Sequence, residues 1–469
     1  MAKITFMGAG STIFAKSILG DSMCSQALRD SHIALYDIDR ARLSESLQML
    51  EAINRNINEG RAKVTTHLGV KNRRAALKGA NYVVNAIQVG GYEPSTVIDF
   101  EVPKKYGLRQ TIADTLGIGG IFRALRTIPV VLDFARDMEA VCPDAWFLNY
   151  VNPMAMITGS LLQGSGVKAV GLCHSVQGCA DGLLRRVEMH GGVDKLNWKI
   201  AGINHQAWLL EITDGGRDLY PEIKRRAARK LRAIRKRGAA KVAEELRARA
   251  QAEGREAWEC PDFMVAMDMV RLTLMLRLGH YITESSEHAS EYLPWFIKGT
   301  HPELIDEFNI PLDEYPRRCV SQIKNWKKSS EELVKNPSLG HTRGHEFGSY
   351  IMEAIETGKP IRVHGNVMNT GLITNLPRRA CVEVPCLVDR NGVQGCYVGD
   401  LPEVCAAVNM TNVNVQILAI DAALTRKRDL VYQAAMMDPH TAAELTIDQI
   451  VAMCDELIEA HGAMLPKYR

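Results

Sequence analysis

The stretch Lys3-Ile4-Thr5-Phe6-Met7-Gly8-Ala9-Gly10-Ser11-Thr12 decides the fold. It is a short apolar strand that runs into two glycines, and a helix is predicted to follow over residues 13–29. The glycines permit a tight turn and a close approach of the backbone to a pyrophosphate, which the free N–H groups of the helix start can bind. Ile13 replaces the third glycine typical of this motif. The position between a first strand and a helix still predicts a dinucleotide site.

Strands and helices alternate along the first 200 residues, which is typical of a parallel sheet covered by helices. After about residue 200, helices mix with short β-rich runs. We therefore expect an α/β fold: a Rossmann-type doubly wound parallel sheet, followed by a mixed α+β C-terminal domain. The predicted strands are Ile33–Tyr36, Tyr82–Ile87, Trp146–Tyr150 and Val167–Leu172; the later β-rich runs are 361–364 and 380–388; the predicted helices are 40–58, 121–139, 344–357, 402–435 and 447–461.

The second strand ends in an acidic sequence, Asp37-Ile38-Asp39. A carboxylate at this point accepts a hydrogen bond from a ribose 2′-hydroxyl and repels a 2′-phosphate, which favours NAD over NADP. A Rossmann-like core that binds no nucleotide is the alternative. The candidate cofactor-binding residues are Gly8, Gly10, Ser11, Thr12, Asp37 and, in the third strand, Asn85.

Length and charge set broad limits on the protein. With 469 residues the chain is too long for one ordinary core, so we expect an NAD-binding domain over 1–200 and a domain for substrate, metal and oligomerisation over 201–469. The formal net charge is only +3, which gives no support to a nucleic-acid partner. A basic run within 222–256 has no aromatic residues for base stacking, which favours an exposed helix over a polyanion-binding arm.

The cysteines and the N-terminus indicate the compartment. The eleven cysteines are scattered and include no CxxC pair, which is typical of reduced, buried thiols. The first residues lead directly into a strand and lack the apolar region of a signal peptide. No apolar run approaches the roughly 20 residues needed to span a bilayer. We expect a cytoplasmic protein without a membrane partner.

Two later segments end in residues that can hold a metal ion. One contains Cys173-His174-Ser175 and the other Asn204-His205. In open α/β sheets, chemistry gathers where strands end, and a thiolate and an imidazole brought together there can bind one divalent ion. A buried thiol and a core histidine are the alternative reading of the same pair.

Further polar clusters suit a ligand rich in hydroxyl groups. Asp114 lies in a polar loop before a Gly-Gly turn, Asn152 follows another strand, and Asn204 precedes His205. With these motifs the chain resembles glycoside hydrolase family 4, along nearly its whole length. The residues that carry the resemblance are the first strand with Gly8–Thr12, Gly90-Gly91-Tyr92-Glu93-Pro94, Gln110 to Gly120, Asn149-Tyr150-Val151-Asn152-Pro153, Cys173-His174-Ser175, Asn204-His205 and Thr283-Glu284-Ser285-Ser286-Glu287-His288.

The resemblance implies roles for several residues. Cys173 and His205 would be the protein ligands of a catalytic Mn²⁺, and Asn152 would contact the sugar near it. Many members of the family have an aspartate after the cysteine, where this chain has His174, so His174 is the candidate for the acid. The family's base lies in a segment that corresponds roughly to 279–288, which leaves Tyr281 and Glu284 as candidates.

The resemblance also implies a reaction that uses NAD⁺ without consuming it. The expected activity is that of an α-galactosidase acting on melibiose-like substrates. C3 of the sugar is oxidised, C2 is deprotonated and the C1 leaving group is eliminated; water then adds and C3 is reduced again. An α-glucosidase or an α-galacturonidase of the same family is an alternative. So are an NAD-dependent 2-hydroxyacid dehydrogenase and a non-catalytic dinucleotide sensor. We expect a small sugar as the partner, and a homo-oligomer, either a dimer or a tetramer.

Overall fold

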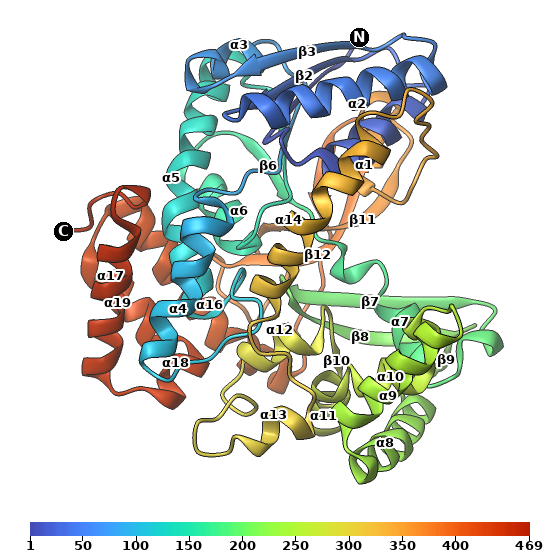
Figure 1. Cartoon of the computed structure of the whole chain (residues 1–469), viewed down its shortest axis with the longest axis vertical. Helices are drawn as coiled ribbons and strands as arrows, with labels where there is room; N and C mark the ends of the chain where they lie inside the picture. The colour runs from blue at the N-terminus through green and yellow to red at the C-terminus, as the bar shows by residue number, and fades with distance from the viewer.

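A computed structural model describes residues 1–469 as helices packed around one thirteen-stranded sheet (Figure 1). Its first part has the strand order β3-β2-β1-β4-β5-β6, and all neighbours are parallel. This is the order of a Rossmann dinucleotide-binding sheet, so the predicted fold class is confirmed. The strands are β1 Lys3–Met7, β2 His32–Asp37, β3 Lys63–Leu68, β4 Tyr82–Asn85, β5 Trp146–Asn149 and β6 Lys168–Gly171.

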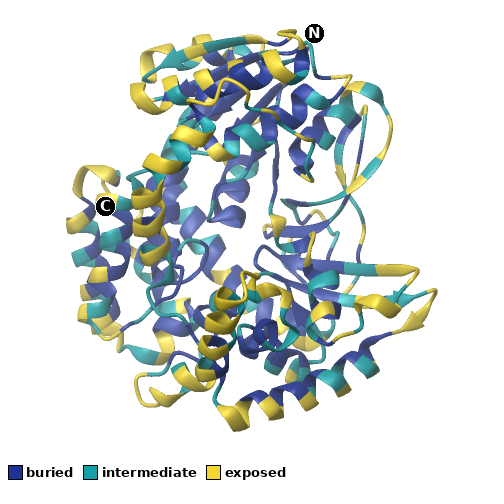
Figure 2. Cartoon of the chain, turned by 45° about the vertical axis from the view of Figure 1, so that its right-hand side comes forward, coloured by how far each residue is buried: buried dark blue, intermediate teal, exposed yellow.

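Helices cover both faces of the parallel strands, which explains why these strands are apolar throughout. Phe6 and Val84 pack with α1 and α2, while Met7 and Val83 pack with α5 and α6 on the opposite face. Successive residues of a strand point to opposite faces, so both faces of the sheet become buried (Figure 2). The helices of this part are α1 Thr12–Cys24, α2 Arg40–Asn58, α3 Arg73–Leu77, α4 Val97–Lys105, α5 Gly117–Val141, α6 Met154–Gly164 and α7 Cys179–Arg186.

The later strands extend the same sheet in antiparallel fashion. β11 pairs with β6 through Asn366 and Gly171, and β12 pairs with β7 through Glu383 and Gly202. The two halves of the chain therefore share one sheet, and the division at residue 200 stays a prediction. These strands are β7 Leu196–Ile203, β8 Gln206–Asp214, β9 Arg217–Asp218, β10 Tyr281–Ile282, β11 Ile361–Met368, β12 Cys381–Asp389 and β13 Gly392–Gly395.

Two helices that we predicted as continuous are broken. The helix expected within 222–256 divides at Gly238, and the one expected over 402–435 divides at Arg426; both residues have positive φ, which an α-helix does not accommodate. The helices of the second half are α8 Tyr220–Arg237, α9 Ala239–Ala252, α10 Pro261–Ala266, α11 Met269–Leu278, α12 Ser286–Glu291, α13 Glu303–Glu307, α14 Glu314–Leu333, α15 Phe347–Thr357, α16 Glu403–Thr425, α17 Arg428–Met437, α18 Pro439–Glu444 and α19 Ile447–His461.

Acidic neighbours pair with many cations of the basic segment. Glu222 bonds to Arg225 and Arg226 one turn later on α8, and Lys230 contacts both Glu188 and Asp262. These ion pairs favour an exposed helix over a polyanion-binding arm for the basic segment 222–256. None of the helices is both long enough and apolar enough to cross a membrane.

A buried ionic group joins three helices beside the loop that carries Asp114. Both oxygens of Asp99 on α4 accept hydrogen bonds from the guanidinium of Arg126 on α5, at 2.6 and 3.0 Å. Nε2 of His461, at the end of α19, lies 3.0 Å from Asp99 Oδ1. All three side chains are at most 2% exposed. The group ties the C-terminal helix to the dinucleotide half of the chain.

We expect Asp99→Asn to lower the free energy of unfolding by about 3–5 kcal/mol, because Arg126 would keep a buried charge without its partner. Urea unfolding followed by circular dichroism measures this. Asp144→Asn is the control, since Asp144 is 97% exposed and its pair with Lys168 contributes little. Equal stability of the two variants would contradict the assignment.

Candidate active site

The turn between β1 and α1 leaves little room for a side chain at either of its two glycines. Gly8 has φ +89°, and a Cβ there would lie 2.7 Å from the carbonyl oxygen of Ala86. A Cβ on Gly10 would lie 2.9 Å from Oδ2 of Asp37, which accepts a hydrogen bond from the Gly10 N–H at 2.6 Å. The turn is thus a bare backbone cradle beside a carboxylate. It fits the pyrophosphate and ribose of a dinucleotide.

The other predicted cofactor residues surround this turn. Ser11 precedes the first turn of α1, which begins at the buried Thr12. Asn85 ends β4, in register with Met7 of β1, and its amide donates to Asn149 at 3.0 Å. Its Oδ1 is buried without a partner. The structure therefore brings all six predicted residues to one end of adjacent strands.

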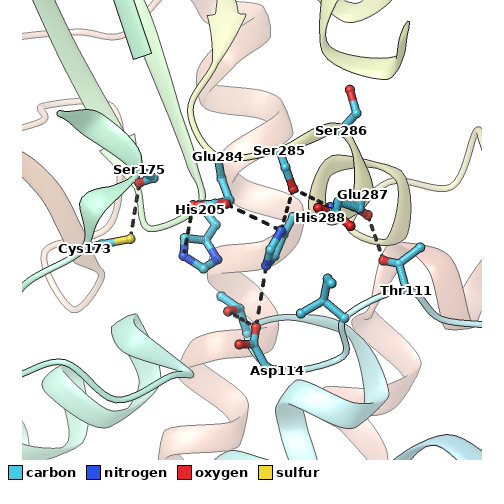
Figure 3. A network of polar contacts seen from close by, with 12 residues as sticks. Thr111, Asp114, Cys173, Ser175, His205, Glu284, Ser285, Ser286, Glu287 and His288 are labelled. Carbon is cyan, nitrogen blue, oxygen red and sulfur yellow. Dashed lines mark hydrogen bonds and ion pairs between the residues drawn. The ribbon is translucent and has the colours of Figure 1, made fainter. Parts of the chain in front are cut away.

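Cys173, His205 and Glu284 converge from three separate segments (Figure 3). Cys173 follows β6, His205 lies between β7 and β8, and Glu284 follows β10. Their sulfur, nitrogen and oxygen atoms all lie within 4.8 Å of one another. That span is close to twice a metal–ligand bond length, and a thiolate, an imidazole and a carboxylate together suit a divalent transition metal. This is our candidate metal centre.

The backbone at this centre is strained. His205 has φ +60° and Glu284 has φ +66°, in the left-handed region that side chains disfavour. Asn204 and His205 form the two-residue tip of the β7–β8 hairpin, yet both are buried. Hairpin tips normally lie in solvent. A buried, strained tip is typical of a functional site.

The charges of the cluster call for a cation. Burial opposes protonation of His205, yet the nearby Cys173 and Glu284 together raise its pKa to about 10. Burial likewise disfavours the ionised form of Glu284, but His205 and His288 hold its pKa below the ordinary value. Glu284 thus places negative charge beside the buried His205. A proton on His205 can balance that charge, and so can a divalent ion.

Asp114 and His288 lie on the other side of His205 and form a second polar group with it. Nε2 of His288 lies 3.8 Å from Oδ1 of Asp114, and its Nδ1 lies 2.8 Å from the Ser285 hydroxyl. Asn152 donates to the other oxygen of Asp114 at 3.1 Å. The predicted sugar-binding pair is therefore brought together beside the metal centre. The sequence predicts no role for His288, which lies within the motif Thr283–His288.

A buried polar row lies under the metal centre. Asn204 is fully buried, and its amide lies beside the carboxylate of Glu383. Glu383 accepts a hydrogen bond from Asn366 at 3.2 Å, and burial raises the pKa of Glu383 to about 7. The sequence analysis missed Glu383 and Asn366 because their strands carried no recognisable motif.

His174 belongs to a neighbouring group. Its Nε2 lies 2.7 Å from Glu346, whose other oxygen accepts a hydrogen bond from the Tyr150 hydroxyl at 2.7 Å. The ring packs edge-on against Phe347, with half of the side chain exposed. The hydrogen bond with Glu346 raises the pKa of His174. Glu346 was also missed, since nothing in the sequence near it signals this contact.

The two candidates for the base are in different surroundings. The Tyr281 hydroxyl donates to Asp268, and its ring packs under the guanidinium of Arg271. Tyr281 is completely buried and has no hydrogen bond to a member of the metal centre. Glu284 is part of that centre. The geometry therefore favours Glu284 over Tyr281 as the base.

Known proteins match the entire length of the chain. The model of the Family 4 glycosyl hydrolase matches residues 3–189, and that of its C-terminal domain matches residues 200–441. The chain is 54% identical to an alpha-galactosidase of Bacillus subtilis over 100% of both chains. It is 34% identical to an alpha-galactosidase of Rhizobium meliloti, over 99% of this chain and 89% of the relative. A 6-phospho-alpha-glucosidase from gut microorganisms, solved in complex with NAD and Mn²⁺, matches 100% of both chains with a TM-score of 0.77 and 19% identity.

The chain therefore belongs to family 4 of the glycosyl hydrolases. The resemblance predicted from the sequence is confirmed.

We expect Cys173→Ser to weaken the binding of Mn²⁺ at least about tenfold, because a hydroxyl is a far poorer ligand than a thiolate. Electron paramagnetic resonance of free Mn²⁺ measures the affinity. Cys260→Ser is the matched control, as Cys260 is a partly exposed cysteine outside the cluster. Unchanged binding in Cys173→Ser would rule out this cysteine as a ligand.

Proposed function

We propose that this chain is an NAD- and Mn²⁺-dependent α-galactosidase that hydrolyses melibiose-like substrates. One observation carries the proposal: a glycine cradle for a dinucleotide and a thiolate–imidazole cluster for a metal occur in one sheet. An ordinary dehydrogenase needs no such metal cluster, and an ordinary glycosidase needs no dinucleotide. The two α-galactosidase relatives support the choice of sugar, and the NAD and Mn²⁺ in the solved family structure support the cofactors.

The cofactors have well-matched sites in the chain. Gly8, Gly10, Ser11, Thr12 and Asp37 would hold NAD⁺, with Asn85 beside them at the end of β4. Cys173 and His205 would hold Mn²⁺. When bound, NAD⁺ supplies a hydride acceptor for C3, and Mn²⁺ supplies Lewis acidity at the neighbouring sugar oxygens.

The surrounding residues bind the sugar and take its proton. Asn152 and Asp114 present amide and carboxylate groups beside the metal centre, and the buried Asn204, next to His205, is the third predicted contact. Of the three residues of the candidate metal centre, Glu284 serves as the base that takes the C2 proton and not as a ligand. Its histidine neighbours hold its pKa below the ordinary value. Tyr281 keeps a structural role through Asp268.

His174 serves as the acid that protonates the leaving oxygen. Glu346 holds the ring at 2.7 Å and raises its pKa, so the imidazole keeps a proton to give. This pair takes the place of the aspartate that many family members have after the metal-binding cysteine.

We also keep the predicted organisation of the chain. The dinucleotide-binding part is residues 1–200, and the part for substrate, metal and oligomerisation is 201–469. All eleven cysteines are free, which supports a reducing compartment such as the cytoplasm. A homo-oligomer, dimer or tetramer, stays a prediction.

The main test is an assay on p-nitrophenyl α-galactoside after dialysis against a chelator. We expect hydrolysis only when NAD⁺, Mn²⁺ and a reductant are all restored, with no accumulation of NADH, because the hydride returns to the sugar. Parallel assays on the α-glucoside and the α-galacturonide decide between the sister specificities. Activity without the cofactors would sink the mechanism, and stoichiometric NADH would indicate a dehydrogenase.

The role of His174 predicts a dependence on the leaving group. We expect His174→Asn and Glu346→Gln to lose about 10²–10⁴-fold in kcat on melibiose, but much less on the p-nitrophenyl glycoside, whose phenolate leaves without a proton. His190→Asn is the control, since His190 is an equally exposed histidine that pairs with Asp181. Equal losses on both substrates would contradict an acid role.

A further inference from the structure

A buried carboxylate holds the backbone of the loop before Asp114. Oε2 of Glu291 accepts hydrogen bonds from the N–H groups of Thr111 at 2.8 Å and Ile112 at 3.1 Å. The N–H of Ala113 is shared between the two oxygens, at 2.9 Å from Oε1 and 3.2 Å from Oε2. Glu291 is 2% exposed and forms no salt bridge with a lysine or an arginine. Three successive N–H groups thus bind this side chain as a backbone nest binds an anion. They oppose the effect of burial, which raises the pKa of Glu291 to about 7.

The loop needs this support because its conformation is unfavourable. Ala113 has φ +54°, a left-handed conformation that alanine disfavours. The three N–H groups are buried, and without Glu291 they would lack partners. The bond to Ala113 is made at the residue directly before Asp114. Glu291 therefore holds the backbone from which the Asp114 side chain projects.

Helix α12 holds this loop at several points (Figure 3). The Thr111 hydroxyl donates to the carbonyl oxygen of Glu287 at 2.8 Å, and His288 approaches Asp114 itself. Glu291 ends the same helix. The short helix α12, in the second half of the chain, therefore sets the position of a sugar-binding residue that belongs to the first half.

We propose that Glu291 is a positioning residue for the sugar site, acting through the loop 111–113 to orient Asp114. This inference rests on the proposed function, because it gives Asp114 the task of binding a sugar hydroxyl. Glu291 does not touch the substrate. Its effect is on binding, since a misplaced Asp114 no longer meets its hydroxyl.

The test compares Glu291→Gln with Glu287→Gln. Glutamine keeps one oxygen for the N–H groups of Thr111 and Ile112 but turns an amide N–H toward the N–H of Ala113. The shorter of the two bonds from Ala113 is therefore lost. Glu287 lies one turn earlier on α12, and its carboxylate pairs with Arg318 instead of the loop. Glu291→Asp, which shortens the side chain by one methylene, replaces the glutamine variant if that variant does not fold.

We expect Glu291→Gln to raise KM for the α-galactoside about tenfold, with a much smaller change in kcat and unchanged affinities for NAD⁺ and Mn²⁺. Hydrogen exchange of a peptide covering 110–116 should accelerate, a result that requires no activity. In the background of Asp114→Asn, the second change should raise KM little further, because the two residues act as a unit. Glu287→Gln should resemble the wild type in each measurement.

Three outcomes would overturn the inference. An unchanged KM with a loss of activity that follows a loss of thermal stability would make Glu291 a structural link only. Full additivity with Asp114→Asn would show that it does not act through that residue. A wild-type protein that cleaves no α-glycoside would overturn the proposed function and this role with it, whereas wild-type activity combined with an unchanged KM in the variant overturns the positioning role alone.

Discussion

The site depends on one row of backbone pairing that crosses four strands. Gly171 of β6 pairs with Asn366 of β11, Asn366 with Glu383 of β12, and Glu383 with Gly202 of β7. Cys173 comes two residues after one end of the row. His205 comes three residues after the other end. The hairpin of β11 and β12 thus joins the parallel sheet to the β7–β8 hairpin and brings together the two proposed metal ligands.

The row tolerates little change in its geometry. A Cβ on Gly171 would lie 2.5 Å from the Thr158 hydroxyl, and a Cβ on Gly202 would lie 2.7 Å from Cα of Ala207. The Asn366 amide donates both to the Gly171 carbonyl and to Glu383, which links the row by side chains as well. Polar groups buried this deeply are costly unless they are paired. We infer that Asn366 and Glu383, in the centre of the sheet, support the candidate metal centre.

The two halves of the chain divide the chemistry between them. The first half contributes the glycine cradle, Asp37 and the loop that carries Asp114. The second half contributes His205, Glu284 and the helix that holds this loop. Helix α15 of the second half also contacts the first half. Glu346 at its start contacts His174, and Phe347 packs in the core shared with α1. Neither half contains a complete site. The shared sheet and the buried ionic group of Asp99, Arg126 and His461 hold the two halves together.

Local sequence determined the elements whose causes are local. The apolar strand and glycine turn at residues 3–12 fixed the Rossmann half, because turn geometry and strand burial depend on near neighbours. The strand-end motifs also indicated Cys173 and His205 as a possible metal pair and placed Asp114 in a polar cluster. The family resemblance then gave Cys173, His205 and Asn152 their expected roles.

Tertiary structure decided what depends on contacts between distant residues. Sequence left Tyr281 and Glu284 equally open; only the pairing of β10 with β8, and of Tyr281 with Asp268, separated them. Four further residues of the site were identified only through contacts with partners 17 to 180 residues away: Glu291, Glu346, Glu383 and His288. Such contacts arise from sheet order and helix packing, and no spacing along the chain records them.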